Sequence, residues 1–252
     1  MTTARKVAIV TGAARPWGLG RATAMMMAQK GYDVAVADIR DDWGTEAVKA
    51  IKDKTGRKAV YVKTDISKPA SSKAMVDEVV KQLGRVDALC NVAAVVENKR
   101  IDDITEAHLD KILSVNLKGT IFTCQAAVQA MRKTGGGTIV NVASGGALQP
   151  LKGLSAYSAS KAGVIIFSKI LAWEVARDNI IVTVVAPGSM LTAMGQEEGP
   201  GQDEFERGTR GKPFGRPLNP EEVAEVLVYA ATIGNPALTG QTLHANGGAY
   251  MV

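Results

Sequence analysis

The sequence has little of several residue types whose abundance would mark a particular class of protein. It contains two cysteines and two histidines in 252 residues. Cys90 and Cys124 lie in apolar stretches and offer neither a disulfide framework nor metal-ligand spacing, which fits a reducing, cytoplasmic compartment. His108 and His244 belong to no ligand cluster, so no metal site is predicted. We expect His108 on an exposed helix surface and His244 in a strand.

Long apolar runs and long basic runs are also missing. No stretch of about 18 apolar residues occurs, and the start MTTARKVAIV lacks the features of a signal peptide, so no membrane association is expected. The net charge is +5 and the sequence pI about 9.1, but the basic residues are scattered among 25 acidic ones. A mixed-sign surface of this kind does not indicate a nucleic-acid partner.

What the sequence does contain is a regular alternation of two kinds of segment. Apolar runs of strand length occur at residues 7–10, 34–37, 59–62, 88–92, 138–142, 180–185 and 242–245, and amphipathic segments at 21–30, 44–54, 70–82, 109–132, 156–177 and 221–232. Such alternation predicts βαβ units, and strands that are apolar throughout are buried on both faces. The expected fold is α/β, a doubly wound parallel sheet of the Rossmann type.

No linker or repeat divides the chain, so residues 1–252 are expected to form a single domain. One shift of composition occurs near residues 195–211, which are rich in glycine and charged residues. We expect a mobile loop segment over residues 190–215, next to the substrate.

The first strand runs into a glycine-containing turn, TGAARPWGLG. Gly12, Gly18 and Gly20 stand where backbone N–H groups and a helix start can hold a pyrophosphate, although turns use glycine for other reasons as well. Pro16 has no N–H to offer, so Pro16 and Trp17 are expected to bulge outward. Trp17 then either covers the pyrophosphate or a neighbouring subunit, or is an exposed loop residue.

Asp38 follows the second strand, where a carboxylate can bind the adenosine ribose hydroxyls and repel a 2′-phosphate. This position favours NAD over NADP. The alternatives are that Asp38 caps a helix or a turn, and that Arg15 or Arg40 pairs with a phosphate.

A possible catalytic group lies at the start of the segment 156–177. Tyr157 and Lys161 are four residues apart and share one helix face, so the ammonium can lie beside the phenol and lower its pKa from about 10. Such a phenol is a usable acid and base near neutral pH. Ser144, at the end of the run 138–142, can hydrogen-bond a substrate oxygen.

These motifs together resemble the short-chain dehydrogenase/reductase family of single-domain oxidoreductases over nearly the whole chain. The resemblance implies that Tyr157 is the catalytic acid/base, and that Lys161 lowers its pKa and holds the ribose hydroxyls. It further implies that Ser144 polarises the substrate carbonyl and that Asn116, a helix-interrupting asparagine, holds a water in a proton relay.

The resemblance also implies which residues bind the cofactor. Asp65 would contact the adenine ring, and the turn at Pro187 and Gly188 would grip the nicotinamide carboxamide. The full set is Gly12, Gly18, Leu19, Gly20, Asp38, Ile39, Asp65, Ile66, Asn91, Tyr157, Lys161, Pro187, Gly188, Met190 and Thr192. Residues 246–248 resemble the family's final loop.

Substrate-side positions follow by the same analogy. They are Val95, Val96, Gly145, Gly146, Ala147, Gln149, Leu191 and Met194. This set is mostly small or apolar, which suits a secondary alcohol or ketone better than a polyanion.

The sequence departs from the family pattern at two places. Five residues, instead of three, separate Gly12 from Gly18. Val92 and Ala94 also replace an asparagine and a glycine after Asn91, which removes a polar anchor and adds bulk beside the cofactor.

The expected function is an NAD-dependent oxidoreductase that transfers a hydride between a secondary alcohol or ketone and nicotinamide. The alternatives are an NADP-dependent carbonyl reductase and a noncatalytic nucleotide-sensing protein. The segments 109–132 and 156–177 carry apolar residues beyond one stripe, and the family commonly forms tetramers through these helices, so a homotetramer is expected.

Overall fold

The computed structural model describes residues 5–191 and 213–251, which build a seven-stranded sheet. The strand order is β3-β2-β1-β4-β5-β6-β7, and every neighbouring pair is parallel. The strands are β1 (Val7–Thr11), β2 (Asp33–Asp38), β3 (Ala59–Lys63), β4 (Ala88–Asn91), β5 (Gly137–Val142), β6 (Ile180–Pro187) and β7 (Thr242–Ala245). The Rossmann-type sheet predicted from the apolar runs is confirmed.

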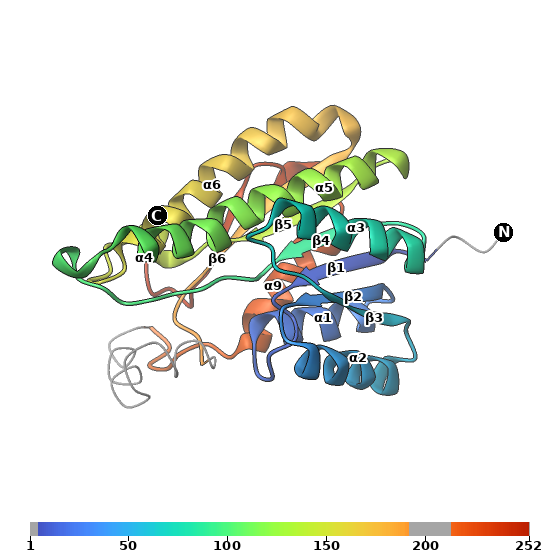
Figure 1. The fold of residues 1–252 in the computed structure, drawn as a ribbon, viewed down its shortest axis with the longest axis horizontal. Coiled ribbons are helices and arrows are strands. Elements are labelled where there is room, and N and C mark those ends of the chain that lie inside the picture. Colours follow the sequence, from blue (N-terminus) through green and yellow to red (C-terminus); the bar gives the residue numbers. More distant parts are fainter. Residues whose placement is uncertain (1–4, 192–212, 252) are drawn as a thin grey trace.

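Helices cover both faces of the sheet, as Figure 1 shows. They are α1 (Leu19–Gln29), α2 (Asp41–Thr55), α3 (Pro69–Leu83), α4 (Glu106–Leu113), α5 (Thr120–Lys133), α6 (Ser155–Val175) and α9 (Pro220–Thr232). Side chains from α1, α2 and α9 form one apolar core with the sheet, and side chains from α3, α5 and α6 form a second. No helix within the described ranges is long and apolar enough to cross a membrane.

The chain reverses its direction of travel across the sheet at β1, which pairs with β2 on one side and β4 on the other. At such a switch point the loops leaving two neighbouring strands diverge and open a crevice at their carboxyl ends. A ligand site is therefore expected beyond the ends of β1 and β4.

The single long helix expected over residues 109–132 is wrong in one respect. A π-helical segment, Ser114–Gly119, separates α4 from α5. The Asn116 side chain lies here, with its Oδ1 accepting from the Val95 N–H at 2.8 Å and its Nδ2 donating to the Val95 carbonyl at 2.9 Å. The helix widens at Asn116, whose side-chain amide binds the backbone of Val95. The spacing of apolar residues does not reveal a change of this kind.

A buried polar network fastens the middle of the sheet to the helices above it. The Asn91 Nδ2 atom donates to the Asn141 Oδ1 at 2.9 Å, and the Thr123 hydroxyl donates to the Asn91 Oδ1 at 2.8 Å. The Asn141 Nδ2 atom then donates to the Ser168 hydroxyl on α6 at 2.9 Å. The network thus links β4, β5, α5 and α6 directly behind the carboxyl ends of the strands.

Removing the amide at the centre of this network should be costly. In Asn141→Leu the buried Asn91 amide loses its acceptor, and we expect the free energy of unfolding to fall by about 3 kcal/mol. Urea denaturation of the variant and of Gln82→Leu, whose amide bonds Glu78 on an exposed helix face, provides the comparison. The surface change should alter stability by less than about 0.5 kcal/mol, and equal effects of the two variants would contradict the assignment.

Candidate active site

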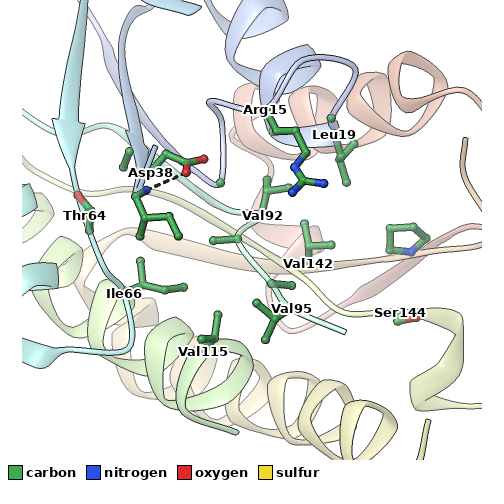
Figure 2. Close-up of a pocket in the computed structure, with 18 of the residues that line it drawn as sticks. Arg15, Leu19, Asp38, Thr64, Ile66, Val92, Val95, Val115, Val142 and Ser144 are labelled. Carbon is green, nitrogen blue, oxygen red and sulfur yellow. Dashed lines mark hydrogen bonds between the residues drawn. The ribbon is translucent and has the colours of Figure 1, made fainter. Parts of the chain in front are cut away.

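A cavity of about 400 Å³ lies beyond the carboxyl ends of the central strands, a size typical of small-molecule sites. Figure 2 looks into it, with Asp38 and Thr64 at one end and Ser144 at the other. The sequence-predicted residues that line it are Gly12, Gly18, Leu19, Gly20, Asp38, Ile39, Asp65, Ile66, Ser144, Tyr157, Lys161, Pro187, Gly188 and Met190. Residues from almost the whole chain therefore meet at one edge of the sheet.

The glycine turn is held tightly between β1 and α1. Gly12 has a φ of +65°, and a Cβ placed on it would lie 2.7 Å from the Ala93 Cα. A Cβ on Gly20 would overlap the carbonyl of Gly12. Only glycine fits these positions, and the close approach leaves α1 starting at the cavity wall, where its N-terminus favours an anion.

Pro16 and Trp17 form a small turn of their own. The Gly18 N–H donates to the Arg15 carbonyl at 3.3 Å, which closes a β-turn around the two residues. Trp17 is 82% exposed and has a φ of +51°, a conformation usually left to glycine at this turn position. Neither residue lines the cavity, so the turn bulges outward as expected. Contact of Trp17 with a neighbouring subunit stays a prediction.

The Asp38 carboxylate is fixed by three backbone donors at the far end of the cavity. Its Oδ1 accepts from the N–H groups of Ile39 at 2.7 Å and Arg40 at 3.2 Å, and its Oδ2 accepts from the Ala14 N–H at 3.0 Å. Such bonds hold the carboxylate in one orientation at the place predicted for the ribose.

Arg15 and Arg40 line the cavity together with Asp38, and the Arg40 guanidinium forms an ion pair with Asp42 at 3.0 Å. The Arg40 Cζ lies 3.8 Å from the centre of the Trp43 ring, and the Arg15 Cζ lies 5.5 Å from it. Sequence reasoning considered both arginines but missed Trp43, which also lines the cavity. The signal available was its place in the first turn of the helix that follows Asp38.

Ser144, Tyr157 and Lys161 meet at the other end of the cavity. Ser144 follows β5, and its hydroxyl accepts from the Gly146 N–H at 3.1 Å, which shapes the loop. Tyr157 and Lys161 share one face of α6, and the Lys161 Nζ lies 5.9 Å from the centre of the Tyr157 ring. Lys161 is 2% exposed and donates to the Val142 carbonyl at 2.8 Å.

Burial shifts the proton affinities of both groups. Burial lowers the pKa of Lys161 to about 8. It raises the pKa of Tyr157, whereas the hydrogen bond between Tyr157 and Ser144 acts to lower it. The Lys161 ammonium is directed at a backbone carbonyl, and burial of the phenol sets the direction of the Tyr157 shift. That Lys161 lowers the tyrosine pKa stays a prediction.

Of the described residues predicted to act in catalysis or cofactor binding, Asn116 and Asn91 do not line the cavity. Asn116 is fully buried, with its amide also donating to the Ser160 hydroxyl at 3.1 Å. Asn91, predicted to bind the cofactor, instead points its amide into the buried polar network. The neighbouring Val92, Ala93 and Ala94 form the cavity wall, with the bulk expected there.

The remaining predictions have mixed outcomes. Asp65 lines the cavity while its Oδ1 accepts from the Ser67 N–H at 3.0 Å and hydroxyl at 2.6 Å. Among the described substrate-side positions, Val95 lines the cavity and the others do not: Val96, Gln149, Leu191 and the residues of the short 3-10 turn Gly145–Ala147. Thr192, Met194 and most of the segment 190–215 lie outside the described residues.

The histidine predictions are half right. His244 lies in β7 as expected, but His108 is 5% exposed, so its predicted exposure is wrong. Its helix α4 contacts α6, and the His108 ring lies with its Nε2 3.9 Å from the Glu97 carboxylate. No group of His, Cys, Asp and Glu that could hold a metal occurs among the described residues.

Comparisons with known proteins agree with this geometry. A family model described as short chain dehydrogenase matches residues 6–203. A 3-oxoacyl-acyl-carrier-protein reductase from Chlamydia muridarum is 33% identical over 243 residues, covering 96% of each chain. An NAD-dependent glycerol dehydrogenase from Listeria innocua is 35% identical over 243 residues, covering 96% of this chain and 93% of that protein.

A solved structure is similar along the whole fold. It is described as a short-chain alcohol dehydrogenase from Sinorhizobium meliloti, and it is 32% identical, with a TM-score of 0.90 and coverage of 97% of this chain and 96% of that one. The chain belongs to the short-chain dehydrogenase/reductase family, whose members are oxidoreductases that use a nicotinamide cofactor on hydroxyl or carbonyl groups.

Proposed function

We propose that the protein is an NAD-dependent oxidoreductase that transfers a hydride between a secondary alcohol or ketone and nicotinamide, with Tyr157 as the acid/base. The observation that carries the proposal is one continuous cavity. It joins the fixed carboxylate of Asp38 to Ser144, Tyr157 and Lys161 at the opposite end. An elongated dinucleotide held at Asp38 has room to bring its reactive end to Tyr157.

The residues present fit a dinucleotide. A Cβ on Gly12 or Gly20 would collide with the backbone of Ala93 or of Gly12, so glycine lets β1 and α1 pack closely, with Gly18 and the start of α1 at the cavity wall. Gly18 and the start of α1 would face the pyrophosphate, and Pro187 and Gly188 would face the nicotinamide end. The bound nicotinamide supplies the redox chemistry, and the protein supplies orientation and proton transfer.

Asp38 is the basis for proposing NAD. Its two oxygens are oriented by three N–H groups and are acceptors suited to the ribose hydroxyls, and its charge disfavours a 2′-phosphate.

An NADP-dependent carbonyl reductase is the second candidate. Arg15 and Arg40 line the cavity together with Asp38 and provide positive charge for a phosphate. The similarity to a 3-oxoacyl-acyl-carrier-protein reductase also supports a ketone-reducing role.

Tyr157 is proposed to exchange a proton with the substrate oxygen. Because burial raises its pKa, the neutral phenol is the stable form near neutral pH, ready to donate in ketone reduction. Alcohol oxidation needs the phenolate and is favoured by higher pH. The Ser144 hydrogen bond favours the phenolate and places a hydroxyl beside the substrate oxygen.

Lys161 and Asn116 are proposed to assist this proton transfer without contacting the substrate. The ammonium of Lys161 is available below about pH 8 and lies close to the phenol ring, where it can also hold ribose hydroxyls. Asn116 keeps Val95 and Ser160 in place with its amide, which shapes the wall next to Tyr157. A water relay through Asn116 to Lys161 remains part of the proposal.

The substrate is proposed to be a small secondary alcohol or ketone. Val95, a predicted substrate-side residue, and Met190, which follows the Pro187–Gly188 turn, give the cavity apolar surface. Such walls favour a compact apolar substrate over a polyanion. Both cysteines are buried free thiols, which supports the cytoplasm as the proposed compartment.

A homotetramer is proposed from an apolar stripe on α6. Ile166, Ile170 and Trp173 follow one another at helical spacing, and they are 57%, 54% and 89% exposed. A contiguous exposed apolar stripe is typical of a subunit interface, and a second copy of the same helix is the proposed occupant.

Cofactor choice is tested by fluorescence titration with NADH and NADPH. We expect the unmodified protein to bind NADH more tightly, and Asp38→Ala to weaken NADH binding about tenfold while NADPH binding is retained or improves. Asp53→Ala, which removes the same charge from an exposed position of α2, is the control and should change neither affinity. Tighter binding of NADPH by the unmodified protein would favour the carbonyl reductase.

Catalysis is tested by Tyr157→Phe. Removing the acid/base should lower kcat about 1000-fold with a panel of secondary alcohols and ketones, while NADH affinity stays within about twofold. Tyr229→Phe, which changes an exposed tyrosine on α9, should be fully active. Near-normal turnover by Tyr157→Phe would refute the catalytic assignment.

Assembly is tested by placing a charge on the α6 stripe. Trp173→Glu should convert the tetramer to a smaller species in size-exclusion chromatography with light scattering, because an unpaired carboxylate at an apolar interface is costly. Trp17→Glu introduces the same change at an exposed tryptophan far along the sequence and should leave the tetramer intact. A mass that does not change in Trp173→Glu would place the interface elsewhere.

A further inference from the structure

The loop that follows the last strand, residues 246–250, contacts both halves of the proposed active site. A Cβ on Gly188 would lie 2.9 Å from the Cα and the carbonyl oxygen of Asn246, so the Pro187–Gly188 turn rests directly on this loop. On the other side, a Cβ on Gly145 would lie 2.5 Å from the Cε1 atom of the Tyr250 ring. The loop therefore lies against the nicotinamide-side turn and the Ser144 loop together.

Hydrogen bonds of the Asn246 side chain close the loop. The Asn246 Nδ2 donates to the Tyr250 carbonyl at 2.9 Å, and its Oδ1 accepts from the Gly248 N–H at 2.8 Å. Asn246 is 6% exposed, and its carbonyl also accepts from the Ala249 N–H at 3.1 Å. These bonds fix the backbone of Tyr250 relative to β7.

The Tyr250 ring is wedged behind the Ser144 loop. The side chain is 8% exposed and packs edge-on against the His244 ring, with the ring centres 5.7 Å apart. Its hydroxyl is buried and has no hydrogen-bond partner within the part of the chain that the structure describes. A buried hydroxyl without a hydrogen bond lowers the stability of the fold, so any stabilising contribution of Tyr250 comes from the packing of its ring.

We propose that Tyr250 is a positioning residue for Ser144: its ring, pressed against Gly145, holds the loop after β5 where the Ser144 hydroxyl meets Tyr157. The contact explains why residue 145 is a glycine, since any side chain there would displace the ring or the loop. The catalytic importance of this position of Ser144 rests on the proposed function. The packing of Tyr250 against Gly145 does not depend on it.

The test reads the proton affinity of Tyr157 without needing a substrate. Ultraviolet difference titration of phenolate formation, with the signal of Tyr157→Phe subtracted in each background, gives the pKa of Tyr157. The groups that face its phenol are Lys161 on the same helix and Ser144 from the loop after β5. If Ser144 drifts away, the phenolate loses a hydrogen bond and the pKa of Tyr157 rises.

Tyr250→Leu should raise the pKa of Tyr157 by about one pH unit, whereas Tyr250→Phe, which keeps the ring, should leave it unchanged and should unfold at the same or a higher temperature. Met251→Ala changes the next side chain, which is 84% exposed, and serves as the matched control. A loss of thermal stability in Tyr250→Leu without any change in the pKa of Tyr157 would overturn the proposal.

A second pair of variants guards against simple misfolding. Gly145→Ala alone should also raise the pKa of Tyr157, because its methyl group collides with the ring. Combined with Tyr250→Leu, it should disturb the site less than the sum of the two single changes, since the smaller side chain makes room. Strict additivity would overturn the proposal.

Steady-state kinetics then separates this inference from the proposed function. Tyr250→Leu should lower kcat between about tenfold and a hundredfold with little change in cofactor affinity, and the alkaline limb of alcohol oxidation should move to higher pH. If the unmodified protein has no dehydrogenase activity, the proposed function fails. The titration still decides whether Tyr250 positions Ser144.

Discussion

Parallel hydrogen bonding between the strands is the constraint on which the rest of this structure depends. A parallel pair cannot be joined by a hairpin, so every connection must return across a face of the sheet, and here helices make that return. All seven strands consequently end at the same edge. That edge gathers Asp38, Ser144 and Gly188, which lie far apart in the chain, around one cavity. The site is thus a consequence of sheet topology before any side-chain chemistry is considered.

Burial sets the chemistry within this framework. The polar side chains that serve the site sit in or against an apolar interior, where each must find a partner or lose its charge. Asn116 and Asn91 satisfy their amides with backbone and with other side chains, and so become supports of the wall. Lys161 gives one hydrogen bond to a backbone carbonyl and has a pKa of about 8. Burial also raises the pKa of Tyr157, which favours the neutral form of its phenol.

Features encoded by local pattern were predictable from the sequence. All seven strands were expected close to their observed bounds, because a strand that is buried on both faces consists of a short run of apolar residues in the sequence. Gly12, Asp38 and Tyr157 were expected at one site and do line one cavity, because each stands next to a strand end or a helix start. Long-range geometry was not predictable in this way. The direction of the Asn91 amide, the burial of His108 and the wedge of Tyr250 behind Gly145 depend on segments that come together only in the fold.

The Pro16–Trp17 turn makes one point on the loop after β1 accessible from outside the cavity. The Gly18 N–H donates to the Arg15 carbonyl, so Pro16 and Trp17 are the two central residues of a closed β-turn. Pro16 and Trp17 therefore stand outside the cavity wall, whereas Arg15 and Gly18 belong to it. A fluorescent label attached at position 17 would project from the rim of the cavity and report on whatever enters it.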